Sequence, residues 1–408
     1  MSDTPFGPGN PRPYLDPTGL SPQTLAVRGG QARSTFDETS EGLYLTSGFV
    51  YGSAEEAEAS FSAEVEKFVY SRYGNPTVAM FEERLRVLEG AEAAYATSSG
   101  MSAVFTALAA LVGAGDRLVS SRGLFGSCFV IVDEILPRWG VETVLVDGSD
   151  LDQWREALSE PTTAVFFETP SNPMQELVDI AAVSELAHAA GARVVVDNVF
   201  GTPVFSRPLE HGADIVVYSA TKHIDGQGRV LGGAVLGPQD YIDGPVQNLI
   251  RHTGPSMSPF NAWVLLKGLE TMDLRVRRMA ESSLAVARAL QAHPRVTQVV
   301  HPWLSDHPQH ELAQAQMSGG GTVVTLAIDG GKAEAFAVMN ALRLVDISNN
   351  LGDSKSLVTH PATTTHRRLG APARAAIGIT DATLRISVGL EAADDLVADI
   401  IAALDGLG

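Results

Sequence analysis

Cysteine is almost absent from this chain of 408 residues, in which Cys128 is the only one. A single thiol excludes disulfide bonds within the chain and zinc sites built from several cysteines, and it is typical of a reducing cytoplasm. The residues that follow it, Phe129, Val130 and Ile131, are apolar. We therefore expect Cys128 to be a small buried side chain and not a nucleophile.

Positive charge is scarce as well. The chain has 29 Lys and Arg residues against 48 Asp and Glu residues, and its formal net charge is −19. Binding to the phosphate backbone of DNA or RNA needs a basic surface, so this composition argues against a nucleic-acid partner. Any phosphate that the protein binds has to be held by a few local groups, against the overall field of the molecule.

Long apolar runs are also missing. The most apolar stretch, residues 103–114, is too short and too rich in small residues to span a bilayer. Residues 1–24 are rich in Pro and Gly and have neither the basic nor the apolar region of a signal peptide, so we expect a loose arm. With 45% hydrophobic and 19% charged residues, the chain is expected to be a soluble, cytoplasmic protein without a membrane partner.

Short apolar segments alternate with helical ones up to Gly237. The spacing of apolar residues predicts helices over 77–90, with Gly90 as the C-cap, over 180–191, and from near Ser102 onward. Apolar runs predict strands at residues 117–121, 141–148, 163–169, 192–198 and 214–220. Nearly all-apolar strands joined by helices are typical of α/β proteins, so we expect a mostly parallel sheet covered on both faces.

The pattern changes after Gly237. We expect a long helical stretch with a break near residues 268–272, then two strands and a final amphipathic helix, in the segments 260–293, 319–330, 383–391 and 393–406. Arg275, Arg277 and Arg278 are expected on a solvated helix face. Because 408 residues exceed one ordinary core, the sequence predicts a larger α/β domain followed by a smaller α+β domain.

Polar side chains follow several of the predicted strands. In α/β sheets, ligands bind beyond the carboxyl ends of the strands. The residues that these ends deliver are Glu168 with Asn172 and Pro173, Asp197 with Asn198, and Ser219 with Thr221 and Lys222. The helix that begins near Ser102 offers the free backbone N–H groups of Gly100 and Met101, which form a ready anion site.

Together these groups match a ligand that has a phosphate, a basic ring nitrogen and a carbonyl. Pyridoxal 5′-phosphate (PLP) has all three. Lys222 would form the Schiff base, and Asp197 would pair with the protonated ring nitrogen so that the ring remains an electron sink. Ser219, Thr221 and the amides of residues 100–101 would hold the phosphate.

Each of these residues also has an ordinary structural interpretation. Asp197 could be a helix N-cap, and Lys222 could be a surface lysine. The glycines of residues 226–233 resemble a dinucleotide fingerprint, but their spacing is wrong and the strand before them ends in Lys222. The spacing of His360 and His366 fits no common metal site, so structural histidines and no metal are expected.

The same residues lie in motifs that closely resemble the Cys/Met-metabolism PLP enzymes, a family that includes cystathionine γ-synthase, the γ-lyases and the homoserine-ester sulfhydrylases. The resemblance extends from about residue 24 to the end of the chain. Seven motifs carry it in family order: YSRYGNPT (70–77), SSGMSA (98–103), ETPSNP (168–173), VVDNVF (195–200), YSATKHIDGQG (218–228), NLGDSKSLVTHPATTTH (350–366) and RISVGLE (385–391).

The resemblance implies the aspartate-aminotransferase fold (fold type I), in a homotetramer of two tight dimers. It implies an N-terminal arm that contacts the neighbouring subunit (1–72), a PLP-binding domain (73–272) and a C-terminal domain (273–408). It also implies roles by position. Tyr70 and Arg72 would reach the cofactor phosphate of the neighbouring subunit, and Tyr70 is a catalytic candidate beside Lys222. The own-subunit phosphate cup would be Gly100, Met101, Ser219 and Thr221.

For the substrate, the resemblance implies that Arg385 binds the α-carboxylate, in a fork-to-fork geometry that lysine could not reproduce. Asn172 and Asn350 would lie beside it. Two residues depart from the family pattern. Phe125 stands where many relatives have a tyrosine stacked on the cofactor, so stacking survives but the phenol is lost. Asn350 stands where several relatives have a serine.

The implied activity is γ-replacement in methionine biosynthesis. An activated homoserine ester would lose its acyl group and take up sulfide to give homocysteine. The acyl group (succinyl or acetyl) and the sulfur donor (sulfide or cysteine) stay open, as do the cystathionine γ-synthase and γ-lyase activities. A PLP-binding regulatory protein without catalysis is the alternative of another class, and the joint presence of Lys222, Asp197, Arg385 and Tyr70 argues against it.

Overall fold

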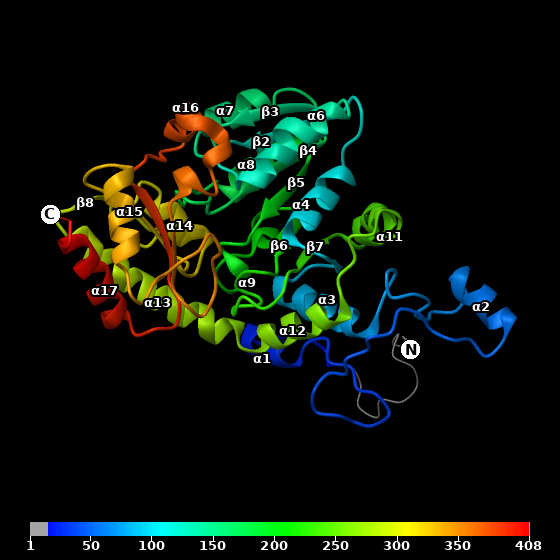
Figure 1. The fold of residues 1–408 in the computed structure, drawn as a ribbon. Helices are drawn as coiled ribbons and strands as arrows, with labels where there is room; N and C mark the ends of the chain where they lie inside the picture. Colours follow the sequence, from blue (N-terminus) through cyan, green and yellow to red (C-terminus); the bar gives the residue numbers. More distant parts are fainter. Residues whose placement is uncertain (1–14, 408) are drawn as a thin grey trace.

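The computed structural model describes residues 15–407, so most of the predicted loose arm at residues 1–24 lies outside the described residues. The chain forms two β-sheets, and helices cover both of them (Figure 1). In the described part, no helix is both long enough and apolar enough to cross a bilayer.

The larger sheet has seven strands in the order β1-β7-β6-β5-β4-β2-β3. All of its neighbouring pairs are parallel except those that involve β7, which runs antiparallel to β1 and to β6. The strands are β1 (Ala93–Thr97), β2 (Arg117–Ser121), β3 (Glu142–Val146), β4 (Ala164–Glu168), β5 (Arg193–Asp197), β6 (Ile215–Ser219) and β7 (Gly233–Gly237). The carboxyl ends of β4, β5 and β6 therefore meet at one edge.

Both faces of this sheet are buried, as the apolar strands predicted. Successive residues of a strand point to opposite faces, so Phe166 and Val195 pack with α4 and α5, whereas Val165 and Val194 pack with α7 and α8. The helices of this part of the chain are α1 (Pro22–Arg28), α2 (Ala54–Phe61), α3 (Pro76–Glu89), α4 (Gly100–Ala109), α5 (Gly126–Val130), α6 (Leu136–Arg138), α7 (Leu151–Ala157), α8 (Ile180–Ala189), α9 (Thr202–Phe205), α10 (Gln239–Tyr241), α11 (Gln247–Thr253) and α12 (Pro259–Glu270).

The second sheet has five strands in the order β10-β11-β12-β9-β8. Its core is built with α13, α15 and α17. The elements are α13 (Met272–Gln291), β8 (Val296–Val300), α14 (His310–Gln316), β9 (Val323–Ile328), α15 (Lys332–Ala341), β10 (Asp346–Ile347), β11 (Leu357–Thr359), α16 (Gly370–Ala376), β12 (Thr383–Ser387) and α17 (Ala393–Asp405). The strand β12 delivers Arg385 toward the larger sheet, where it contacts Asn172.

Local signals correctly placed the strands β2 to β6, β9 and β12 and the helices α3, α4, α8, α12, α13 and α17. Helix α3 ends at Gly90, which adopts the left-handed conformation (φ 81°) that favours glycine, and Ser99 caps α4. The expected break in the long helical stretch falls at Thr271, between α12 and α13. The strands β1, β7, β8, β10 and β11 were not predicted from the sequence; β1 and β7 are built largely of small residues.

The prediction for Arg275 was wrong. Its side chain is not solvated but 7% exposed. The guanidinium donates to the carbonyls of His223 (3.0 Å) and Gly268 (2.8 Å), and it would clash with any side chain at position 226, where Gly226 has a φ of 68°. Helix α13 thus turns this arginine inward, onto the turn that directly follows Lys222.

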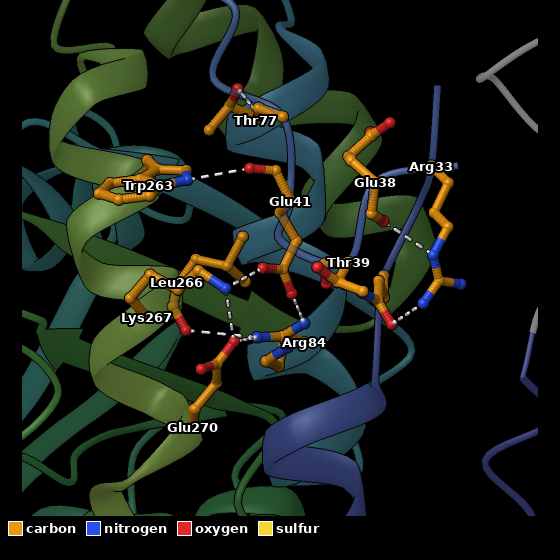
Figure 2. Close-up of polar contacts among 12 residues, drawn as sticks. Arg33, Glu38, Thr39, Glu41, Thr77, Arg84, Trp263, Leu266, Lys267 and Glu270 are labelled. Carbon is orange, nitrogen blue, oxygen red and sulfur yellow. Dashed lines mark hydrogen bonds and ion pairs between the residues drawn. The ribbon is translucent and has the colours of Figure 1, made fainter. Parts of the chain in front are cut away.

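A buried ion-pair network joins the segment before α2 to helices α3 and α12 (Figure 2). Arg84 on α3 is fully buried and pairs with Glu41, whose other carboxylate oxygen accepts from Lys267 on α12. Arg84 also donates to the carbonyls of Gly29 (2.7 Å) and Leu266 (3.3 Å). Burial alone would raise the pKa of Glu41, but the ion pairs with Lys267 and Arg84 hold it below its ordinary value.

We predict that Arg84→Met destabilises the protein by about 3–5 kcal/mol, because it removes one cation of a buried carboxylate and leaves backbone carbonyls without a donor. Urea unfolding measures the change. The ion pairs lower the pKa of Glu41 below 4.5, so the difference from wild type should persist above that pH and shrink as the pH falls through the lowered value.

The matched control is Arg155→Met on α7, which removes an exposed pair with Asp152. Exposed pairs contribute less than about 1 kcal/mol, so this variant should unfold close to wild type. An equal effect of the two substitutions would show that burial of the Arg84 network does not stabilise the fold.

Candidate active site

A cavity of about 220 Å³ lies at the carboxyl ends of β4, β5 and β6. Six of the eight predicted strand-end residues line it together with the start of α4, and only Pro173 and Asn198 do not. The complete lining is Ser99, Gly100, Met101, Val104, Phe125, Cys128, Glu168, Asn172, Asp197, Val199, Phe200, Ser219, Thr221, Lys222, Leu231, Asn349, Leu351 and Arg385. The parallel-strand rule therefore brought these polar groups to one place.

Lys222 leaves the end of β6 and enters this cavity, where its amine is largely removed from water. Its Nζ donates to Asn350 Oδ1 at 2.5 Å. Burial disfavours the charged form and the nearby guanidinium of Arg385 adds to the effect, so the pKa of Lys222 falls to about 8. Far more of the amine is therefore uncharged near neutral pH than in an ordinary lysine, about a tenth at pH 7, and this is the form that attacks a carbonyl or accepts a proton.

Asp197 ends β5 and is paired in register with Glu168, the last residue of β4. Both carboxyl groups are buried. Asp197 Oδ1 accepts the amide of Val199 at 3.1 Å, but burial outweighs this bond and raises the pKa of Asp197 to about 7. Burial, and then the charge of Asp197, raise the pKa of Glu168 well above its ordinary value. Asp197 can thus hold a protonated base without the competition of bulk water.

The N-terminus of α4 forms an anion site beside β6. The first amides of a helix have no hydrogen-bond partner within the helix. The amide of Ser102 donates to Ser99 Oγ at 3.1 Å, whereas the amides of Gly100 and Met101 have no partner inside α4. A side chain at position 100 would lie 2.5 Å from Cβ of Ser219, so glycine is required for this close approach. The hydroxyl of Thr221 is paired with the backbone of Gly232.

Arg385 lies at the opposite wall on β12 and is 1% exposed. Its Nη1 donates to Asn172 Oδ1 at 2.9 Å, and its Nη2 donates to the carbonyls of Asn349 (2.9 Å) and Asn350 (3.0 Å). Its Nε is buried without a hydrogen-bond partner within the described chain. A fixed guanidinium with one unsatisfied donor fits the carboxylate of a ligand.

Phe125 precedes α5 and lines the cavity, and its amide donates to Glu168 Oε2 at 3.0 Å. Cys128, one turn further on, is 2% exposed, and burial raises the pKa of its thiol well above the ordinary value. A buried thiol that resists ionisation is a poor nucleophile, so the prediction of a small buried side chain is confirmed.

Tyr70 and Arg72 do not line this cavity within the described chain. The Arg72 guanidinium lies 5.1 Å from the ring centroid of Tyr70 and 4.7 Å from that of Tyr73, and it donates to the carbonyl of Arg251. Tyr70 is 40% exposed. One chain by itself therefore does not bring this pair together with Lys222.

Other chemistry considered from the sequence finds no support. His360 and His366 are buried and bonded to neighbouring hydroxyls and to the carbonyls of Asp381 and Asn172. Among residues 15–407, no cluster of three or more His, Cys, Asp or Glu side chains is arranged to hold a metal ion. The two histidines therefore have structural partners.

A larger hollow of about 420 Å³ lies where α1, α9 and α13 meet. Its arginines are already paired, Arg207 with Glu210 and Arg277 with Asp273. It lacks the lysine, the paired acids and the helix N-terminus of the smaller cavity, so the chemistry belongs to the smaller one.

Sequence reasoning overlooked some of the cavity. Glu168 was recognised at a strand end but received no role, although an acid that directly follows an apolar strand was a usable signal; its register with Asp197 is known only from the structure. The apolar wall, which includes Val199, Phe200 and Leu351, had no chemical signal at all. Asn349 lines the cavity, whereas the side chain of its neighbour Asn350 contacts Lys222.

The groups in the cavity fit PLP. A desolvated lysine suits the aldehyde, and Asp197 suits the ring nitrogen. The N-terminus of α4 suits the phosphate, and the unsatisfied Nε of Arg385 suits an amino-acid carboxylate.

Comparison with known proteins agrees with this fit. The chain is 66% identical over 396 residues to an O-succinylhomoserine sulfhydrylase of Mycobacterium tuberculosis (strain CDC 1551 / Oshkosh), which covers 96% of this chain and 98% of that protein. It is 48% identical over 393 residues to an O-succinylhomoserine sulfhydrylase of Pseudomonas aeruginosa, with 96% and 97% covered.

A solved structure from Campylobacter jejuni that contains N′-pyridoxyl-lysine-5′-monophosphate superposes with a TM-score of 0.91 at 30% identity, covering 95% of this chain and all of that one. The profile of the Cys/Met metabolism PLP-dependent enzymes matches residues 23–405. The chain therefore belongs to the Cys/Met metabolism PLP-dependent enzyme family, with the fold type I architecture of that family.

Proposed function

We propose that this protein converts O-succinyl-L-homoserine and sulfide into L-homocysteine and succinate, as a cytoplasmic enzyme of methionine biosynthesis. The reaction class is carried by one observation, the desolvated amine of Lys222 in a cavity shared with Asp197 and Arg385. The choice of substrate is supported by the similarity to two O-succinylhomoserine sulfhydrylases along nearly the whole chain. The segments LFGSC (124–128) and 347–366 support the same choice.

PLP, when bound, supplies an electron sink for the negative charge that develops at the substrate Cα. Lys222 would hold it covalently and, once its amine is free, take the proton from Cα and then help to move a proton at Cβ. The ester oxygen leaves Cγ as succinate, hydrosulfide forms the new C–S bond at Cγ and keeps its proton as the thiol, and Cβ and Cα would then regain their protons. Asp197 would keep the cofactor ring nitrogen protonated.

Arg385 would orient the substrate by its α-carboxylate. Its Nη groups are fixed by Asn172 and by the carbonyls of residues 349 and 350, so the guanidinium is held before any substrate arrives. A preorganised donor loses little entropy on binding. The buried Nε then gains an acceptor that it lacks in the free protein.

Asn350 contributes a second contact, since its side-chain oxygen accepts from Lys222. When the lysine is released from the cofactor, this bond would hold the free amine over the substrate. Phe125 would stack on the cofactor ring, but a phenyl ring has no proton to transfer. In this protein the proton transfers at Cα and Cβ therefore fall to Lys222, and a catalytic role for Tyr70 depends on the neighbouring subunit.

We also propose a homotetramer of two tight dimers, with shared sites in each dimer. Tyr70 and Arg72 follow the segment that contains α2, and α2 stands off the body of the molecule (Figure 1). This segment exposes apolar side chains, Leu45 at 66%, Val50 at 89% and Phe61 at 65%, and such exposure marks an interaction surface. The proposed division is an arm at 1–72, a cofactor domain at 73–272 and a C-terminal domain at 273–408, and it is supported by the two separate sheets.

The lowered pKa of the Lys222 amine leads to a prediction about how this protein captures PLP. With a pKa of about 8, its amine is charged and unreactive below that pH and neutral above it. Covalent capture of PLP by the apoenzyme can be measured by borohydride reduction and peptide mapping. The rate of capture should rise with pH and level off above a midpoint of about 8. Lys222→Ala should capture none, whereas the exposed Lys355→Ala should match wild type. A midpoint near the ordinary 10.5 would contradict desolvation of the amine.

The second prediction concerns substrates. Initial rates with O-succinyl- and O-acetylhomoserine, each with sulfide and with cysteine, should give the highest kcat/KM for the succinyl ester with sulfide. Discrimination between the acyl groups is expected to be modest, about 10-fold to 100-fold. Methionine and cystathionine, tested alone for release of a 2-oxo acid, identify the lyase alternative. Preference for elimination from these thioethers would overturn the proposed γ-replacement.

The third prediction concerns shared sites. Arg72→Ala and Lys222→Ala chains, each nearly inactive, should regain activity when mixed and allowed to exchange. Random exchange makes half of the dimers hybrid, each with one intact site, so about a quarter of wild-type activity is expected. Two separately prepared batches of Lys222→Ala, mixed in the same way, are the control. Failure to regain activity despite demonstrated exchange would mean that Arg72 serves its own subunit.

A further inference from the structure

Two buried carboxyl groups lie side by side on neighbouring strands at the floor of the cavity. Glu168 and Asp197 are register partners on the parallel strands β4 and β5, so their side chains point to the same face. They are 3% and 7% exposed. Within residues 15–407, neither carboxylate has a Lys, Arg or His nitrogen within 4.0 Å, although nineteen other pairs in the chain do form ion pairs.

The groups that face Glu168 come from the start of α5, from β12 and from the loop after β4, where the backbone of Asn172 favours the ionised form of the acid. The amide of Phe125 donates to its Oε2 at 3.0 Å, and the thiol of Cys128 on α5 lines the same cavity. Arg385 on β12 is the nearest source of positive charge, but its Nη groups are already bonded to Asn172 and to the backbone of residues 349–350. Glu168 therefore interacts with the backbone amides of Phe125 and Asn172 and forms no ion pair within the described residues.

The charge balance of the loaded site allows only one of the two acids to ionise. A protonated ring nitrogen brings one positive charge, which Asp197 would take. Of the two basic side chains in the cavity, Arg385 is matched by the carboxylate of the substrate, and the Lys222 amine is uncharged until it accepts a proton. A second buried carboxylate would have no partner, and two neighbouring carboxyl groups in a low-dielectric site share a single charge for the same reason.

We propose that Glu168 is a positioning residue that stays protonated during turnover, so that Asp197 alone carries the negative charge at the ring nitrogen while Glu168 Oε2 holds the Phe125 segment in place. This inference rests on the proposed role of Asp197. The directions of the two shifts agree with it, because burial raises the pKa of both acids and the charge of Asp197 further raises that of Glu168. The neutral acid costs little to bury, and its carbonyl oxygen still accepts the amide of Phe125.

The position of Phe125 explains why such a support is useful. Phe125 would cover the cofactor ring. The next residue, Gly126, packs closely against the carbonyl of Thr365, since a Cβ added at position 126 would lie 2.7 Å from that oxygen. The segment is thus fixed at one point by Thr365 and at another by Glu168. Loss of the second point would let the aromatic ring move relative to the cofactor while the fold stays intact.

The test compares Glu168→Gln with Glu168→Leu in the holoenzyme. Leu removes the acceptor and should lower kcat about 10-fold and alter the visible circular dichroism of the bound cofactor. Gln is uncharged at every pH and keeps an oxygen acceptor, so it should restore most of the lost kcat and the wild-type dichroism. If Gln is as impaired as Leu, an ionised carboxylate is required and the proposal is wrong.

Infrared difference spectra read the proton directly. Wild type minus Glu168→Gln at about pH 8, where an ordinary glutamate is ionised, should show the carbonyl stretch of a protonated carboxylic acid. A carboxylate band instead would overturn the proposal. Asp197→Asn separates the two ideas, because it should weaken PLP binding if Asp197 pairs with the ring nitrogen. If Asp197→Asn binds PLP normally, the proposed role of Asp197 is wrong. The infrared band of Glu168 would still show whether Glu168 is protonated.

Discussion

Removal of the Lys222 amine from water is the constraint on which the chemistry of this protein depends. The lysine follows β6, whose apolar residues are buried on both faces of a sheet, so its backbone cannot move to carry the amine into solvent. Desolvation lowers its pKa to about 8. The turn after it is held by the buried guanidinium of Arg275 and by Gly226, which accepts a backbone conformation closed to most residues. The fold therefore delivers a reactive amine at a fixed place.

The acids opposite Lys222 follow from the same burial. A carboxyl group in this cavity gains little from ionising unless a cation comes with the ligand, and a protonated ring nitrogen is such a cation. In the proposed site, Asp197 would then be a strong partner for the cofactor, and Glu168 would be free for a structural task. Burial raises the pKa of both acids, which is the condition for two adjacent acids to share a single charge.

The N-terminal segment combines a fixed part with an exposed part. Arg84, Glu41 and Lys267 anchor it to α3 and α12, and Asn75 holds it again through the carbonyl of Tyr44 at 2.9 Å. Beyond these points the segment around α2 leaves the body and exposes large apolar side chains. An anchored base with an apolar end is suited to reach a neighbouring subunit, which is what a shared site requires.

The sequence by itself determined the class of fold and the residues at the strand ends. Strands β2 to β6 could be predicted because each is an apolar run that stops at polar residues, and parallel strands bring those stops to one edge. From this rule alone Asp197, Ser219 and Lys222 fall into one cavity with the start of α4. The strands β1 and β7 escaped notice, since Ala and Gly carry little of the branched-residue signal that marks a strand.

Only the tertiary structure decided which charges are buried and what they touch. Arg275 lies among arginines that the helical pattern places in solvent, yet the packing of α13 against the turn after Lys222 buries it. Asn350 contacts Lys222 across 128 positions of the chain. Local sequence reports periodicity and capping, because those depend on neighbours along the chain. Desolvation and charge pairing depend on neighbours in space, and these exist only once the two sheets have come together.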